Sequence, residues 1–83
     1  MKYIAQINIM PLKALLDPQG KTVLNSANKN GFEMVENVRI GKNIEIELNA
    51  ENKDTAAKII NDLCNKILIN PVIEYFNFTL MEV

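Results

Sequence analysis

The stretch that decides the fold is residues 44–68, IEIELNAENKDTAAKIINDLCNKIL, which joins the clearest strand of the chain to its clearest helix. Apolar and polar side chains alternate over 44–50, and a period of two is typical of a half-buried strand. Beyond Asn52, apolar residues recur at steps of three and four, the pattern of a helix with one buried face. The inward positions of that helix are Ala56, Ile60, Leu63, Cys64 and Ile67. We therefore expect a strand over 44–50 and a helix over 52–68.

The remaining elements follow outward from this stretch. Tyr3 to Met10 alternate as a strand, with Tyr3, Ala5, Ile7 and Ile9 on one face. Asp17-Pro18 begins a helix to about Asn30, because Asp17 can cap free N–H groups and proline is tolerated at the first helical position. Its inward side chains would be Val23, Leu24 and Ala27, and the apolar Leu12, Leu15 and Leu16 indicate that the loop before it is packed. Further strands are expected over 34–40 and 73–81, with a hairpin turn over 41–43.

The element order is thus β-α-β-β-α-β in a single domain spanning residues 1–83. Right-handed crossovers then favour an α+β fold of two layers. We expect a four-stranded antiparallel sheet with both helices on one face, of ferredoxin-like topology or a variant of it.

The composition excludes several kinds of chemistry. The chain has 83 residues, one cysteine and no histidine. An internal disulfide, a zinc site and an imidazole general base are therefore all excluded. A core this small is marginal on its own, so oligomerisation is the natural supplement, as a homodimer or a higher homo-oligomer.

The charges and the hydropathy pattern also exclude some partners. Nine basic and ten acidic residues are interspersed, which is not the basic footprint of a nucleic-acid binder. No apolar run approaches the roughly 20 residues of a membrane span. The N-terminus turns polar too early for a signal peptide, so we expect a cytoplasmic protein without nucleic acid or membrane partners.

The sheet face opposite the helices is expected to be mixed in character, as in an interface. Scattered exposed apolar residues are the simpler explanation of the same pattern. Its apolar members would be Ile4, Met10, Val35, Tyr75 and Met81, and its polar members Gln6, Asn8, Arg39, Glu45 and Glu47.

Three short stretches are candidates for contact with a partner, although each also has a structural explanation. The helix start supplies Asp17, Gln19, Gly20 and Lys21, where Lys21 could help the helix N-terminus attract an anion. The hairpin supplies Arg39, Gly41 and Lys42. The turn after the second helix supplies Asn70 and Pro71, which also stop that helix. Cys64 is expected to be a buried small hydrophobe rather than a nucleophile.

Taken together, these stretches resemble the PurS family, the small subunit of phosphoribosylformylglycinamidine synthase. Three blocks in the family's order and spacing carry the resemblance. They are Leu16 to Lys21 followed by Val23, then Gly31-Phe32 with Val35, Val38 to Lys42 and Ile44-Glu45, and finally Cys64, Leu68 and Asn70 to Glu74.

The resemblance implies a subunit without catalytic residues or a cofactor of its own. A PurL-type synthase subunit would use ATP and magnesium, and a PurQ-type glutaminase subunit would release ammonia from glutamine. The small subunit would act as a dimer that joins the two and helps to enclose the ammonia route. By this resemblance, the complex would be a carbon–nitrogen bond-forming ligase of purine biosynthesis.

Other functions stay open on the residues alone. A small-ligand-binding regulatory module of the ACT type shares the expected element order. An acylphosphatase would need an arginine in a phosphate-cradling loop after the first strand, whereas the sole arginine is Arg39. An RNA-binding module would need a basic surface and paired strand aromatics.

Overall fold

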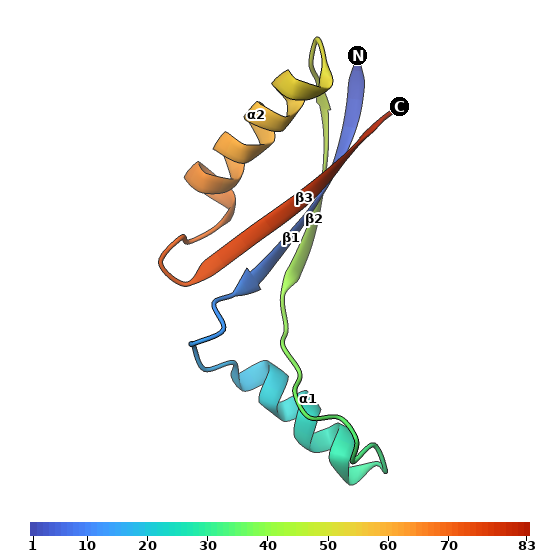
Figure 1. Cartoon of the computed structure of the whole chain (residues 1–83), viewed down its shortest axis with the longest axis vertical. Helices are drawn as coiled ribbons and strands as arrows, with labels where there is room; N and C mark the ends of the chain where they lie inside the picture. Colours follow the sequence, from blue (N-terminus) through green and yellow to red (C-terminus); the bar gives the residue numbers. More distant parts are fainter.

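The computed structural model describes all residues, 1–83, and contains a three-stranded antiparallel sheet in the order β2-β1-β3. One helix lies on the sheet and the other extends beyond its end (Figure 1). The elements are β1 (Lys2–Pro11), α1 (Pro18–Lys29), β2 (Lys42–Asn49), α2 (Lys53–Leu63), the π-helix η1 (Cys64–Leu68) and β3 (Glu74–Glu82). None of these helices combines the length and the apolar character that a membrane span requires.

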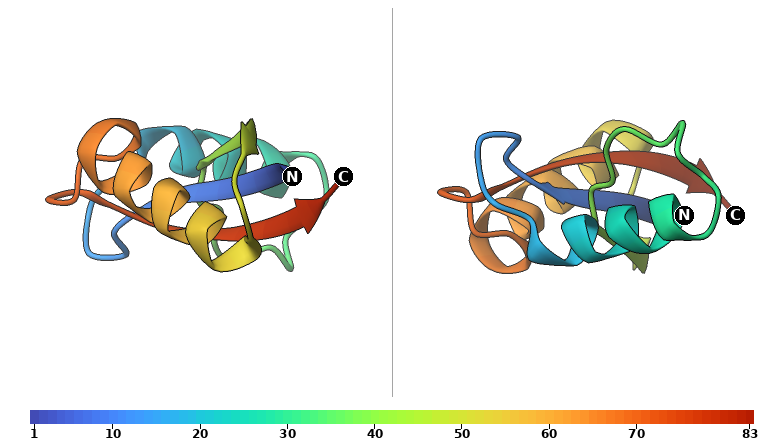
Figure 2. Two further views of the ribbon diagram at one scale, coloured as in Figure 1. Left: turned by 90° about the horizontal axis from the view of Figure 1, so that it is seen from above. Right: turned by 90° about the horizontal axis from the view of Figure 1, so that it is seen from below.

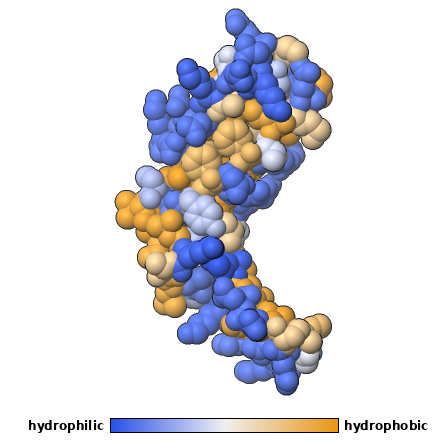
Figure 3. All heavy atoms as spheres, viewed as in Figure 1, coloured by the Kyte–Doolittle hydropathy of each residue, from blue (hydrophilic) through white to orange (hydrophobic).

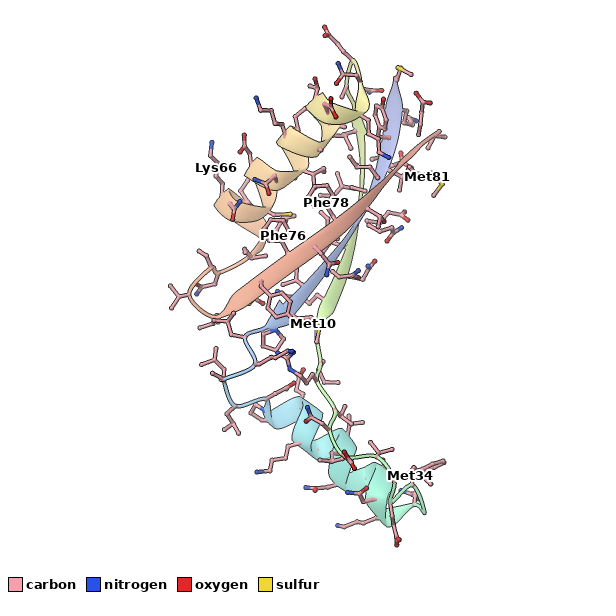
Figure 4. All side chains as sticks on the ribbon, viewed as in Figure 1. Met10, Met34, Lys66, Phe76, Phe78 and Met81 are labelled. Carbon is pink, nitrogen blue, oxygen red and sulfur yellow. The ribbon has the colours of Figure 1, made fainter.

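The core lies between β1 and α2. This is what the alternation in the strand and the three- and four-residue steps in the helix predict. One face of the central strand is buried, and so is the inward stripe of the helix. The buried residues of the two elements are Tyr3, Ala5, Ile7, Ile9, Ala56, Ile60 and Cys64. Phe76 and Phe78 of β3 complete this layer from the edge, with their rings stacked at 6.3 Å, and both lie between the sheet and α2 (Figure 4).

The predicted helix over 52–68 is confirmed, with one change in its last turn. Asn52 caps it by accepting a hydrogen bond from the N–H of Thr55 at 2.8 Å. From Cys64 the helix widens into η1, where the N–H of Ile69 reaches back five residues to the carbonyl of Cys64. The wider turn moves the inward stripe, so that Leu68 packs on the core whereas Ile67, predicted to face inward, is 71% exposed.

The predicted four-stranded sheet is wrong. Residues 34–40 form no strand, and β2 follows them directly without a hairpin turn. The segment runs away from the sheet beside α1, where no strand is available as a neighbour (Figure 1). Its Ile40 N–H is instead bonded to the side chain of Asp17. Val35 and Arg39 are therefore not part of the open sheet face, as had been expected.

The expectation that both helices cover one face is also wrong. Only α2 packs on the sheet, and α1 lies beyond the end of the sheet at which β1 finishes (Figures 1 and 2). Gly20 is the one buried residue of α1, and Val23, predicted to face inward, is 45% exposed. We call residues 12–40 the arm, because they project from the sheet as a unit without a core of their own.

The arm makes the molecule strongly elongated. The radius of gyration is 16.4 Å, and the principal extents are 51 × 28 × 14 Å. A compact domain of this length would have a radius of gyration of about 12 Å. Phe32 and Met34, at the far end of the arm, are 56% and 74% exposed. The fold thus leaves apolar surface uncovered at a distance from its own core.

The open face of the sheet has the mixed character that the sequence predicts. The strand register places Ile4 beside Met81 and Met10 beside Tyr75, one pair towards each end. Between them, side-chain amides are bonded across the strands. Asn43 donates to Asn8 and Asn8 donates to Asn77, at 2.7 and 3.2 Å, and Gln6 donates to Glu45 at 2.5 Å.

Candidate functional site

The three candidate stretches meet at one end of the sheet, which we call the junction: residues 11–21, 38–42 and 70–74. Here β1 ends at Pro11, paired with Glu74 at the start of β3, while Ile9 is paired with Lys42 at the start of β2. The N–H of Leu12 donates to the carbonyl of Ile73 at 2.9 Å. Stretches that lie far apart in the sequence are thus neighbours in space.

The carboxylate of Asp17 joins the start of α1 to the extended segment that leads into β2. One oxygen accepts a hydrogen bond from the N–H of Gly20 at 3.0 Å, which caps α1 as predicted. The other accepts from the N–H of Ile40 at 2.8 Å. These two bonds, more than the neighbouring Arg39 charge, lower the pKa of Asp17 from its ordinary value. Asp17 is therefore ionised at neutral pH, and each of its carboxylate oxygens accepts a hydrogen bond.

Gly20 allows this close approach of helix and extended segment. A Cβ atom at this position would collide with the carbonyl oxygen of Val38 and would lie 2.7 Å from a carboxylate oxygen of Asp17. Glycine is needed here for lack of space. The Asp-Pro-Gln-Gly sequence thus has a structural explanation, as the cap of α1 and its contact with 38–40.

Arg39 connects the arm to the sheet. Its guanidinium donates to the carbonyl oxygen of Pro11 and, at 3.4 Å, to the hydroxyl of Tyr75. The side chain therefore links the segment before β2 to the end of β1 and to the start of β3. It is half-buried rather than free in solvent.

Polar contacts also hold the turn after η1. The N–H of Asn70 donates to the carboxylate of Glu74 at 2.9 Å, and the Asn70 side chain accepts from the N–H of Val72 at 3.1 Å. The same carboxylate lies 3.6 Å from the ammonium of Lys42. The Asn-Pro turn and the start of β2 are linked in this way through one glutamate.

Two hollows flank Asp17 on the surface of the junction. The first, about 420 Å³ in volume, is lined by Lys13, Leu15, Leu16, Asp17, Lys21, Leu24, Asn37, Val38 and Arg39. The second, about 580 Å³, is lined by Ile9, Pro11, Leu16, Asp17, Pro18, Gln19, Ile40, Gly41, Lys42 and Glu74. Of the nine candidate residues, Asp17, Gln19, Lys21, Arg39, Gly41 and Lys42 line one hollow or the other. Gly20 lies buried beneath them, and Asn70 and Pro71 lie in the adjacent turn.

The junction also carries exposed apolar side chains that the sequence interpretation missed. Leu15 and Leu16 were expected to pack in their loop, yet they are 43% and 77% exposed. Val72 and Ile73, in the facing turn, are 77% and 43% exposed. Apolar side chains gather on the convex edge of the molecule at this level (Figure 3). The sequence did carry a signal for this exposure: an apolar pair stands next to a proline turn in both places, before Asp17-Pro18 and after Pro71.

The acidic and thiol side chains form no cluster suited to a metal ion. No three or more Cys, Asp or Glu side chains lie together in a way that could hold a metal ion. The thiol of Cys64 is buried under the sheet, and this desolvation raises its pKa.

Comparison with known proteins gives a consistent result over nearly the whole chain. The family model described as PurS, phosphoribosylformylglycinamidine (FGAM) synthase, matches residues 4–82. The PurS subunit of this synthase from Synechocystis sp. is 36% identical over 76 residues, covering 92% of this chain and 76% of that protein.

Solved structures agree in fold as well as in sequence. Thermus thermophilus PurS aligns with a TM-score of 0.89 at 36% identity, covering 100% of this chain and 99% of that one. A chain in the structure of PurLQS from Thermotoga maritima aligns with a TM-score of 0.90 at 28% identity, covering 98% and 99% of the two chains.

Proposed function

Because the chain belongs to the PurS family of phosphoribosylformylglycinamidine synthase subunits, we propose that it is the non-catalytic subunit that bridges the glutaminase and synthase subunits of this ligase. In this role it serves purine biosynthesis in the cytoplasm. The PurL-type synthase partner binds ATP and magnesium, and the PurQ-type glutaminase partner binds glutamine.

The observation that carries the proposal is the convergence at the junction. The three candidate stretches, each of which lies within one of the three blocks that carry the family resemblance, meet there, although they are separated by up to about fifty residues in the chain. Exposed leucines and the Val72-Ile73 pair stand beside Arg39 and Lys42 on this surface. An apolar centre with a polar rim, including arginine, is the usual composition of a protein interface.

The elongated shape supports the same role. A subunit that joins two larger proteins needs two separate contact surfaces, and the arm and the sheet supply them 51 Å apart at their extremes. The uncovered apolar residues of the arm also need a partner to be buried. A second copy of the chain would meet this need, in a homodimer or higher homo-oligomer.

The physical purpose of such a bridge is to exclude water. Ammonia released into bulk water would be protonated and would no longer act as a nucleophile. A subunit that seals the passage between the two active sites keeps ammonia neutral until it reacts. The candidate contact residues for this seal are Asp17, Gln19, Gly20, Lys21, Arg39, Gly41, Lys42, Asn70 and Pro71.

The experiment compares glutamine-fed with ammonia-fed synthesis of formylglycinamidine ribonucleotide by the matching partner subunits, with and without this chain. We expect glutamine-fed activity to require the chain, and ammonia-fed activity at high ammonia concentration to be largely independent of it. Equal glutamine-fed rates with and without the chain would refute the bridging role. The ACT-type alternative is not favoured, since its four-stranded sheet is absent here.

A further inference from the structure

One side of the junction is unusually basic for this chain. The first hollow, called here the basic hollow, is lined by Lys13, Lys21 and Arg39 but by only one acidic residue, Asp17. Overall the protein has nine basic and ten acidic residues. One third of its basic residues therefore surround a single hollow, together with one tenth of its acidic ones.

The one carboxylate there does not neutralise the lysines. Both oxygens of Asp17 accept backbone hydrogen bonds, from Gly20 and Ile40. The ion pairs of the chain are Lys2–Glu47 and Lys42–Glu74, and neither involves Lys13 or Lys21. Both lysine ammonium groups are thus unpaired and exposed at the rim of the hollow.

The same geometry argues against a small free anion as the ligand. The N–H groups at a helix N-terminus would be its natural partners. Here the N–H of Gly20 is taken by the Asp17 carboxylate and that of Lys21 by the Asp17 carbonyl, and Pro18 has none. An anion at the helix start would meet an ionised carboxylate rather than free donors.

The walls of the hollow indicate what fits instead. Leu15, Leu16, Leu24 and Val38 supply apolar surface between the cations. A polypeptide that carries acidic side chains next to apolar ones matches both features, because charge complementarity at the rim steers association while the apolar centre is buried.

We propose that the basic hollow binds an acidic and apolar segment of a partner subunit in the complex. This inference rests on the bridging function proposed above and names the chemistry of one of its contacts. Lys13 and Lys21 are assigned the role of pairing with carboxylates of that segment, and Leu16 and Leu24 that of packing against its apolar side chains.

The test is charge reversal by Lys13→Glu together with Lys21→Glu, measured as assembly with the matching synthase and glutaminase subunits by analytical ultracentrifugation. The matched control is Lys53→Glu with Lys66→Glu, which makes the same change in net charge on exposed residues. Lys53 begins α2, and Lys66 lies on η1 and points away from the junction (Figure 4). Binding is measured at about 50 and 300 mM NaCl, since exposed charge pairs are screened by salt.

We expect the Lys13/Lys21 variant to bind one partner at least tenfold more weakly at low salt, with the Kd of the unaltered chain rising towards the variant's value at high salt. The control pair should bind normally. Equal binding by the Lys13/Lys21 variant and the unaltered chain would overturn the inference while leaving the bridging function intact. Equal weakening by both variants would also overturn it, because net charge alone would then be responsible.

Two further results would reassign the hollow. If the Lys13/Lys21 variant binds both partners normally but loses a thermal stabilisation by pyrophosphate that the unaltered chain shows, the ligand is a small anion. If the variant alone loses its own oligomeric state, the occupant is a second copy of this chain. If the unaltered chain binds neither partner and does not support glutamine-fed synthesis, the proposed function fails and this inference falls with it.

Discussion

The carboxylate of Asp17 accepts a hydrogen bond from the backbone N–H of Ile40 at 2.8 Å, across 23 positions of sequence. This bond, with the cap on Gly20, fixes the start of α1 against the segment that leads into β2. The N–H of Ile40 is thus directed to a side chain rather than to a neighbouring strand. The contact between the two ends of the arm therefore depends on one side chain.

Replacing Asp17 by asparagine should lower stability in a pH-dependent way. The pKa of Asp17 is lower in the folded chain than in an unfolded one, so ionisation favours folding above the unfolded value of about 3.9. This stabilisation is lost as the pH falls through the lower, folded pKa. We expect the unaltered chain to exceed Asp17→Asn in Tm at pH 7 and the difference to shrink below about pH 4.

Thermal denaturation at fixed protein concentration, followed by circular dichroism between pH 2.5 and 7, measures this difference. A matched control is Asp54→Asn, in the first turn of α2, for which no such pair of backbone bonds exists. If the Tm curves of Asp17→Asn and the unaltered chain run parallel over the whole pH range, the negative charge of Asp17 does not stabilise the contact between α1 and Ile40.

Gly20→Ala should destabilise the chain even though alanine is the better helix former. The added Cβ collides with the carbonyl of Val38, so either α1 or the 38–40 segment must shift. Such a shift breaks the Ile40 bond to Asp17 as well. We expect a Tm lower by several degrees, whereas Ser26→Ala, on the exposed side of the same helix, should leave the Tm unchanged or slightly higher.

Urea denaturation of the two variants separates this steric effect from helix propensity. A Gly20→Ala chain as stable as the Ser26→Ala chain would show that the space beside Val38 is not limiting.

Much of the fold follows from periodicity within the sequence. The alternation in Tyr3–Ile9 and Ile44–Leu48 and the helical stripe of α2 predict the core correctly, because each is a local pattern with one buried side. The caps by Asp17 and Asn52 were predictable for the same reason. Local rules determine where these elements begin and which face they bury.

The errors arose where a long-range contact overrides the local pattern. Residues 34–40 alternate like a strand, but strand formation requires a neighbouring strand, and Asp17 binds the N–H of Ile40 instead. The placement of α1 was wrong because Val23 and Leu24 form too short a stripe to cover a sheet. The exposure of Leu16 was missed because local pattern does not show what a loop faces.

The candidate site was partly predictable in the same sense. The residue types of the three stretches drew attention to them separately, and only the β1–β2 and β1–β3 registers show that they meet. The cationic rim of the basic hollow could not be predicted from the sequence, since Lys13 and Arg39 are 26 positions apart and lie together only after folding.

Ile60→Ala should be among the most damaging substitutions in α2. Ile60 is fully buried against Ala5, Ile7 and Ile9. Removing three of its carbon atoms leaves a cavity in a small core, at a cost of about 2–5 kcal/mol. The adjacent Ile59→Ala is the matched control, because Ile59 is 43% exposed and should lose well under half as much.

Equilibrium urea denaturation at one fixed protein concentration gives both values, since any self-association would otherwise change the apparent stability. Similar losses for the two variants would mean that Ile59 is buried in an assembly as deeply as Ile60 is in the single chain.

Cys64 should react with a thiol reagent only when α2 opens. The thiol is fully buried, and desolvation raises its pKa, so the thiolate that attacks the reagent is both scarce and inaccessible in the folded chain. At pH 8 we expect modification by Ellman's reagent to be at least a hundredfold slower in buffer than in 8 M urea. Ile60→Ala should accelerate the reaction in buffer, because it lowers the free energy of opening at the neighbouring turn. Ile59→Ala should not, and a fast reaction in the unaltered chain would place Cys64 outside the core.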